Sequence, residues 1–195
     1  MKKRVFALFI LLSLCLSFTA CNIDFGDWDG SKRTVVMYGV ATHIKDLDHT
    51  CIYFPTAGHM ATPRLMDGKA APEYSAGDLI KVTFTEVIGD IPIMESFPGQ
   101  FGAEAEKIEV KKANVGFEIK ADSFIFSDNV PEGTELTVGD KLNFNVTVGG
   151  LPKHIAEGEI TNLTGGRYTA ELTLYGTAEE FLQYIFEYDL KAKKQ

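Results

Sequence analysis

Cysteine is scarce in this sequence, with three residues among 195. Cys15 lies in an N-terminal apolar run, Cys21 follows that run after two small residues, and only Cys51 belongs to the rest of the chain. If the N-terminal segment is processed, no intrachain disulfide is available and a hydrophobic core must hold the fold. A hydrophobic content of 45% at this length is enough for one or two small domains.

Positive charge is also in short supply, because 19 Lys and Arg residues face 27 Asp and Glu residues. Three of the cations, Lys2, Lys3 and Arg4, stand at the N-terminus. Residues 21–195 therefore carry 16 basic and 27 acidic side chains, a net charge of −11. A surface of this sign repels phosphate backbones, which argues against nucleic acid as a partner.

Familiar catalytic motifs are absent from the sequence. It has no phosphate-binding glycine loop, Walker signature, paired-cysteine zinc motif or G-x-S-x-G. The sequence therefore predicts neither a cofactor nor an enzymatic activity.

Long hydrophobic runs are missing as well, and the longest, FALFILLSLCLSF, covers residues 6–18. It is shorter than the roughly 20 residues that span a bilayer as a helix. The cationic start, this run and the small residues before Cys21 are typical of a secretory signal, which we place at residues 1–20.

The segment FTAC resembles the bacterial lipoprotein signal, in which an aliphatic residue and two small residues precede a lipid-accepting cysteine. Phe18 departs from the usual Leu, so an ordinary cleaved signal stays an alternative. The resemblance implies acylation of Cys21 and a protein held on the extracytoplasmic face of the cell membrane, with membrane lipid as its first partner. Residues 21–33 are polar and without pattern, which predicts a lipidated flexible tether.

From Thr34 onward the pattern is that of an all-β protein. Short β-branched and aromatic runs alternate with turns, and no helical periodicity competes with them over residues 34–112. Five short strands with one long loop have the rhythm of a small OB-like barrel.

The series YGVATHI, CIYFP, YSAGDLIKVTF, ESFPGQ and AEKIEV is similar to the small OB-fold lipoproteins of the YobA type, found largely in Gram-positive bacteria. Its E-S-aromatic-P-x-Q turn and A-x-x-I-x-V strand match the end of that domain. The similarity covers residues 35–112. It implies an OB-like barrel and a lipoprotein address, and no activity, because none is established for the family.

The second half repeats a phrase of the first, since YSAGDLIKVTF (74–84) and LTVGDKLNFNV (136–146) both place Gly-Asp before an alternating strand. Convergent turn chemistry and duplication both account for this. Further alternating runs predict that residues 113–195 form an immunoglobulin-like β-sandwich. Thr177 and Glu180 form a capping box, so we expect a helical turn at 178–183 and then a strand to about residue 192.

Two groups of side chains are candidates for binding. His43 and Cys51 flank the polar KDLDH segment, which should place them opposite each other across a hairpin, and His49 ends that segment at the rim. Three such ligands on one hairpin could make an open metal site. The competing interpretation is a solvated loop beside a buried cysteine. Tyr74, Phe97 and Phe101 lie near chain reversals, where they would be either exposed binding anchors or lids over the barrel end.

These observations predict a membrane-anchored bacterial lipoprotein that acts as a non-catalytic binding or interaction module of the cell envelope. We expect its partner to be an envelope protein. The alternative is a surface lipoprotein that binds a small ligand or a metal.

Overall fold

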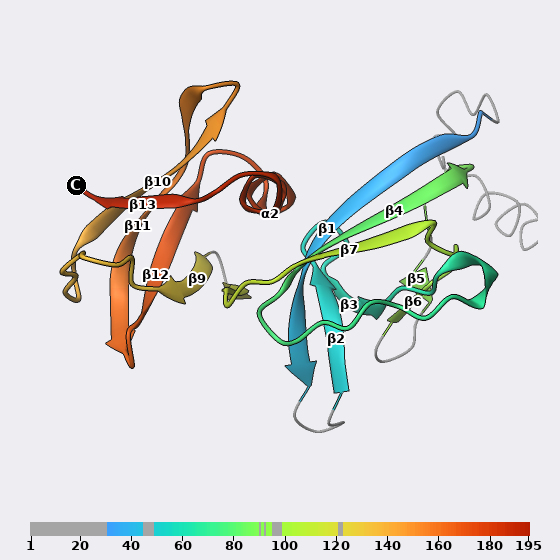
Figure 1. Cartoon of the computed structure of the whole chain (residues 1–195), viewed down its shortest axis with the longest axis horizontal. Coiled ribbons are helices and arrows are strands. Elements are labelled where there is room, and N and C mark those ends of the chain that lie inside the picture. Colours follow the sequence, from blue (N-terminus) through green and yellow to red (C-terminus); the bar gives the residue numbers. More distant parts are fainter. Residues whose placement is uncertain (1–30, 45–48, 90, 92, 95–98, 121–122) are drawn as a thin grey trace, which may run out of the picture. The chain divides into compact units, whose positions relative to one another are not determined.

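The computed structural model describes residues 31–44, 49–89, 91, 93–94, 99–120 and 123–195. Lys32–Gln195 form one compact unit, and the chain is mostly β, as the sequence predicts (Figure 1). The predicted signal peptide, the predicted lipidation site Cys21 and nearly all of the predicted tether lie outside the described residues.

The first half of the compact unit supplies a seven-stranded sheet in the order β5-β6-β3-β2-β1-β4-β7. All neighbours pair antiparallel except β3 and β6, which are parallel. A short 3-10 turn, η2 (Met66–Gly68), follows β3. The strands are β1 (Arg33–Ile44), β2 (His49–Phe54), β3 (His59–Thr62), β4 (Leu79–Val87), β5 (Ile93–Met94), β6 (Gly99–Phe101) and β7 (Lys107–Lys111).

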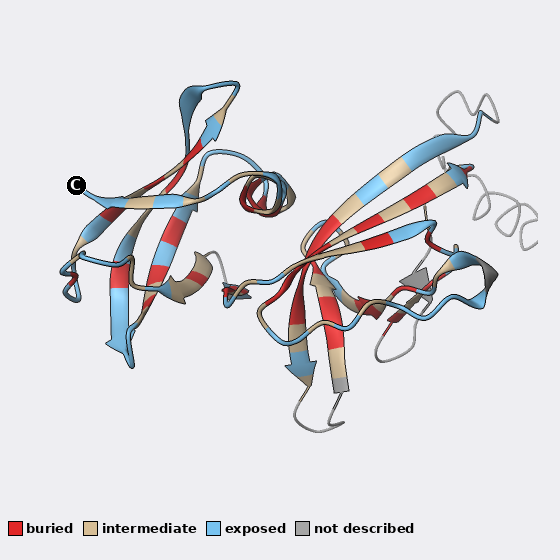
Figure 2. Ribbon diagram, in the orientation of Figure 1, coloured by how far each residue is buried: buried red, intermediate tan, exposed pale blue. Residues whose placement is uncertain are grey.

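The second half supplies a six-stranded antiparallel sheet in the order β13-β10-β11-β12-β9-β8. Burial alternates along β12, where Tyr168, Ala170 and Leu172 are buried and Glu171 is exposed (Figure 2). The strands are β8 (Gly116–Lys120), β9 (Ser123–Asn129), β10 (Lys141–Val148), β11 (Leu151–Thr164), β12 (Arg167–Leu174) and β13 (Lys191–Lys194).

The C-terminal segment departs from the prediction. Helix α2 runs over Ala178–Glu187, four residues past the expected end, and the final strand β13 begins only at Lys191. The predicted capping box at Thr177 and Glu180 is present. Helical spacing buries Phe181, Leu182 and Ile185 on one face, and this burial outweighs the alternation of aromatic residues that favoured a strand.

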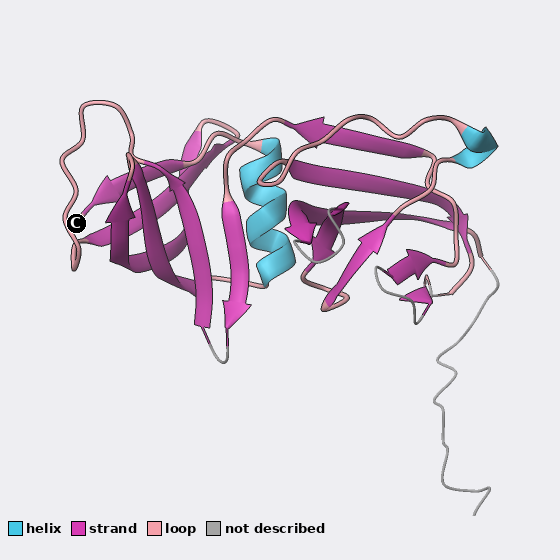
Figure 3. Ribbon diagram, turned by 90° about the horizontal axis from the view of Figure 1, so that it is seen from below, coloured by secondary structure: helices cyan, strands magenta, loops and turns pink. Residues whose placement is uncertain are grey.

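Helix α2 contacts strands of both sheets (Figure 3). Near its C-terminal end the Tyr38 hydroxyl and the Lys81 ammonium donate to Oε1 of Glu187, over 2.9 and 2.6 Å. Tyr38, Val40 and Leu79 of the first sheet pack into the core of the second, while a further cluster lies within the first sheet's own residues. The division into two domains after residue 112 stays a prediction.

The repeated Gly-Asp phrase forms the same turn twice. In the first copy Oδ2 of Asp78 accepts the Ser75 N–H at 2.8 Å, and the Asp78 N–H donates to the Ser75 carbonyl at 3.0 Å. In the second, Asp140 and Thr137 make the same two bonds at 2.7 and 3.1 Å. The preceding glycines have φ of 91° and 90°, which other residues rarely adopt. The repeated phrase therefore specifies the same turn at both places.

Asp78 differs from its twin in being buried, with 3% of its surface exposed. Burial acts to raise the pKa of Asp78, but bonds from Lys112 and from the Ser75 and Ala113 N–H groups lower it below its ordinary value. Three donors bind one buried carboxylate, so this turn holds the start of β4 against the segment after β7.

We expect Asp78→Asn to lower the free energy of unfolding by about 1–3 kcal/mol at pH 7, because the carboxylate gives up charge-assisted bonds. The depressed pKa stabilises the folded chain above an unfolded-state pKa of about 3.9, and this stabilisation is lost as the pH falls through the folded-state value. Urea unfolding at pH 7 and pH 3 should therefore show the two proteins converging at the lower pH. Asp140→Asn, in the less buried twin turn, is the control and should cost less, although the Asp140 carboxylate also accepts from Lys194 at 2.7 Å. An equal loss in both variants contradicts the prediction.

Candidate binding groove

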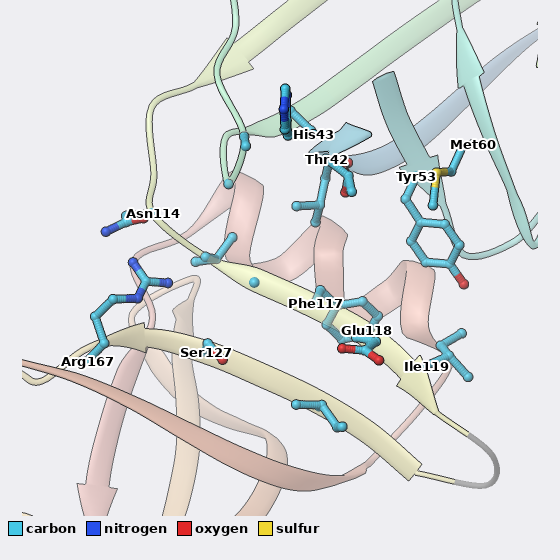
Figure 4. A pocket seen from close by; sticks show the side chains of 17 residues that line it. Thr42, His43, Tyr53, Met60, Asn114, Phe117, Glu118, Ile119, Ser127 and Arg167 are labelled. Carbon is cyan, nitrogen blue, oxygen red and sulfur yellow. Dashed lines mark hydrogen bonds between the residues drawn. The ribbon is translucent and has the colours of Figure 1, made fainter. Parts of the chain in front are cut away.

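A groove of about 640 Å³ lies between the end of the β1–β2 hairpin and the β8–β9 hairpin (Figure 4). Its residues come from segments more than 120 positions apart in the sequence, from Val40 to Arg167. The lining residues used below are Val40, Thr42, His43, Tyr53, Met60, Asn114, Val115, Gly116, Phe117, Glu118, Ile119, Ile125, Ser127 and Arg167.

The buried Gly-Asp turn brings the two walls of the groove together. The Gly77 N–H donates to the Ala41 carbonyl at 2.8 Å, and the Val115 N–H donates to the Gly77 carbonyl at 3.1 Å. A side chain at Gly77 would meet the Val115 carbonyl at 3.1 Å, and its φ of +91° is one that glycine tolerates. The turn therefore fixes the start of β8 beside the end of β1.

The centre of the groove is apolar. Val40, Val115 and Phe117 are buried in the core of the second sheet, and Tyr53 packs partly against the same core. Ile119 continues the face of Val115 and Phe117 but is 42% exposed. Apolar side chains along β8 therefore extend from the buried core into the groove.

Polar groups occupy particular positions along the groove. Arg167 and Asn114 lie at one end, where the Asn114 amide donates to Oδ1 of Asn129 at 3.4 Å, and His43 lies on the facing wall (Figure 4). Glu118 lies nearer the other end, beside Ile119. The groove therefore has a cationic end and a more apolar end that carries one carboxylate.

The predicted metal ligands are not brought together. In the hairpin Cys51 pairs with Thr42 and His43 pairs with Thr50, so Cys51 and His43 point to opposite faces. Cys51 is fully buried, its thiol donates to the Thr42 carbonyl at 3.7 Å, and burial raises the pKa of the thiol. His49 pairs with Ile44, but its side chain lies outside the described residues. Within the described ranges no group of three His, Cys, Asp or Glu side chains could hold a metal ion.

Of the predicted aromatic anchors, Tyr74 and Phe101 do not line the groove. Phe101 is 7% exposed and its ring lies 5.2 Å from that of Phe54 and 5.1 Å from that of Phe84. An exposed anchor at Phe101 is therefore wrong, because burial of the ring closes the core of the first sheet. Tyr74 packs half-buried against the same core, as a lid would. Phe97 lies outside the described residues.

A second hollow of about 470 Å³ lies on the outer face of the second sheet. Glu157, Glu159 and Glu171 line it together with Lys141. It has no apolar floor comparable to that of the groove, so the groove is the stronger candidate for binding.

No protein-family model, curated protein or solved structure matches the chain. Of the helices in the described ranges, none has the length and apolar character needed to cross a membrane.

Proposed function

We propose that this chain is a lipid-anchored, non-catalytic binding protein of the bacterial cell envelope, which takes a protein partner into the groove between the β1–β2 and β8–β9 hairpins. The observation that carries the binding part is the groove itself, with an apolar centre and polar ends. An apolar patch inside a polar rim is the usual anatomy of a protein–protein contact.

The anchoring part is supported by the N-terminal sequence, in which an apolar run and the segment FTAC end at Cys21. Each buried methylene adds about 0.8 kcal/mol of membrane affinity, so two or three acyl chains on Cys21 would hold the protein firmly. The polar residues after Cys21 give the compact unit room to meet a partner at the membrane surface.

Binding of a small molecule is the second candidate, because the groove volume lies within the range of about 300–1,000 Å³ that is usual for ligand sites. We favour a protein partner because the groove follows the exposed edge of a strand. Binding of a metal ion has weaker support than binding of an organic molecule, because His43 and Cys51 lie on opposite faces of their hairpin.

The proposal is tested on cells that make the protein with a photoreactive amino acid at Ile119, which is 42% exposed within the groove. Irradiation should give a discrete crosslinked protein whose added mass exceeds that of a small ligand. The same group at Val138, which is 61% exposed and outside the groove, is the control and should not give that product. A small-molecule adduct at Ile119 favours the second candidate, and no adduct contradicts both.

The anchor is tested in the same cells by fractionation and intact mass. Cys21→Ser should move the protein from the membrane to the soluble fraction, and the unaltered protein should begin at Cys21 with added acyl mass. Cys51→Ala is the matched control, because it removes the buried cysteine and should leave the protein in the membrane fraction. An unaltered protein without acyl mass contradicts the anchoring part alone.

A further inference from the structure

Strand β8 is an edge of the second sheet, and its open side faces the groove. It stands last in the strand order and pairs only with β9. Among the described residues, the backbone of Gly116–Lys120 makes no hydrogen bond to any other segment. An edge strand of this kind carries N–H and C=O groups that can pair with another strand.

The groove follows this open edge over most of its length. Phe117 and Ile119 lie on one face of β8 and Gly116 and Glu118 on the other, and all four line the groove. Ile125 and Ser127 of β9, which pair with Glu118 and Gly116, line it as well, so the groove extends from the edge of β8 over the neighbouring face of β9. Tyr53 and Met60 form the facing wall, so an added chain would have apolar side chains to contact (Figure 4).

The charges of the groove give this edge a direction. Gly116 pairs with Ser127, and Arg167 of β12 pairs with Asn129 two residues farther along β9, so Arg167 is level with the beginning of β8 but lies across β9 from it. The Arg167 side chain points across β9 toward Asn114 (Figure 4). Within the described ranges no carboxylate lies at ion-pair distance from Arg167. Burial raises the pKa of Asp128, and the charge of Arg167 acts in the opposite direction on that pKa.

We infer that the groove takes an extended peptide that adds to β8 as an antiparallel strand and places its free C-terminal carboxylate at Arg167. This inference rests on the proposed function and names the chemistry of the partner. An antiparallel peptide runs from the Ile119 end of β8 to the Gly116 end, so its last residue reaches the cationic end. A parallel peptide would bring its ammonium group to the guanidinium instead.

Each element of the groove has a role in this mode of binding. The edge of β8 supplies main-chain hydrogen bonds, and alternate side chains of the peptide face the apolar wall at Tyr53 and Met60. Asn114 adds an amide beside the guanidinium of Arg167, which binds carboxylates through paired hydrogen bonds. The five residues of β8 match about five residues of an extended partner, which rise about 3.3 Å each.

The test uses the full chain purified in detergent and a library of random heptapeptides displayed with free C-termini. Selected peptides are synthesised with a C-terminal carboxylate, with a C-terminal amide, and with single backbone N-methyl groups at each position, and binding is followed by fluorescence anisotropy. We expect the amide to bind at least tenfold more weakly than the acid. We expect N-methylation to weaken binding at alternate positions only, because every second N–H of an added strand faces β8.

The Arg167→Gln variant locates the carboxylate. It should bind the acid about as weakly as the unaltered protein binds the amide, and its affinity for the amide should not change. Arg64→Gln, an exposed arginine outside the groove, is the control and should leave both affinities unchanged.

Three results would overturn the inference: no selected peptide, equal binding of acid and amide, or N-methylation without effect at every position. The peptide changes are made on the unaltered protein, so they stay informative even if Arg167→Gln folds poorly. A crosslinked protein at Ile119 together with any of these results leaves the proposed function standing and removes only the strand-addition mode. If a selected peptide behaves as expected but Ile119 gives no crosslinked protein in cells, the groove binds strands and the proposed protein partner in the envelope is contradicted.

Discussion

Replacing Phe181 by Ala is expected to lower the free energy of unfolding by about 3–5 kcal/mol. Phe181 is 2% exposed at the centre of helix α2. Its ring stacks on Phe117 at 5.7 Å and meets Phe126 edge-on at 5.5 Å. Truncation removes these contacts and leaves a cavity in the core of the second sheet. Urea denaturation followed by circular dichroism measures the loss.

Two variants frame this prediction. Phe181→Leu keeps much of the buried volume and should cost clearly less than Phe181→Ala. Gln183→Ala changes an exposed residue of the same helix and should stay within about 0.5 kcal/mol of the unaltered protein. A loss below about 1 kcal/mol for Phe181→Ala would show that α2 is not part of the cooperative core.

The helix also supports the groove. Phe117 contacts Phe181 on the core side and lines the groove through β8. Weakened packing under Phe117 would loosen the strand whose edge we propose as the binding surface. Stability of α2 and affinity in the groove are therefore expected to fall together, although Phe181 itself does not line the groove.

Much of the fold follows from local patterns in the sequence. Alternation predicts β12, where Tyr168 and Leu172 are buried and Glu171 is exposed. The polar segment after Ile44 predicts the hairpin of β1 and β2, which pair directly. The start of α2 follows from the capping box at Thr177, because the side-chain bonds that form it involve residues only three positions apart.

Where the prediction fails, long-range packing decides the outcome. Tyr184, Phe186 and Tyr188 alternate as in a strand, yet the first two lie in α2 and Tyr188 is its C-cap, because the helical face with Phe181 fills the core of the second sheet. For Phe101 the sequence leaves an exposed anchor and a buried lid both open, and two rings that are distant in sequence decide for burial. Periodicity carries no information on such partners.

The candidate site shows the same limit more strongly. The metal-site hypothesis needs His43 and Cys51 on the same face of the hairpin, but Cys51 pairs with Thr42, and a shift of one residue along a strand moves a side chain to the other face. The groove is lined by residues of β1, β8 and β12, and no local motif in the sequence predicts that Arg167 or Glu118 lines it. The one available signal is Ile119, an apolar residue that continues a buried face and yet stays 42% exposed.

The last prediction concerns Gly39, a glycine in the middle of β1. A Cβ at this position would lie 2.5 Å from Cγ2 of Ile52 and 2.7 Å from the carbonyl oxygen of Tyr53. A side chain can rotate away, but the carbonyl belongs to the backbone of β2 and cannot move without disturbing the hairpin. We expect Gly39→Ala to lower the free energy of unfolding by about 2–3 kcal/mol, as overpacking in a core does.

Gly116→Ala is the matched control, because it makes the same change inside another strand. Its Cβ would lie 3.4 Å from Cβ of Ser127, which is ordinary contact, so stability should hold or rise by up to about 1 kcal/mol. Equal losses in the two variants would mean that loss of glycine in a strand, and not the close approach of β2, causes the effect. Since the Tyr53 backbone is the part displaced by Gly39→Ala and the Tyr53 ring forms a wall of the groove, this variant should also weaken binding there. The requirement for glycine at position 39 thus follows from how closely β2 must approach β1 for Tyr53 to face β8.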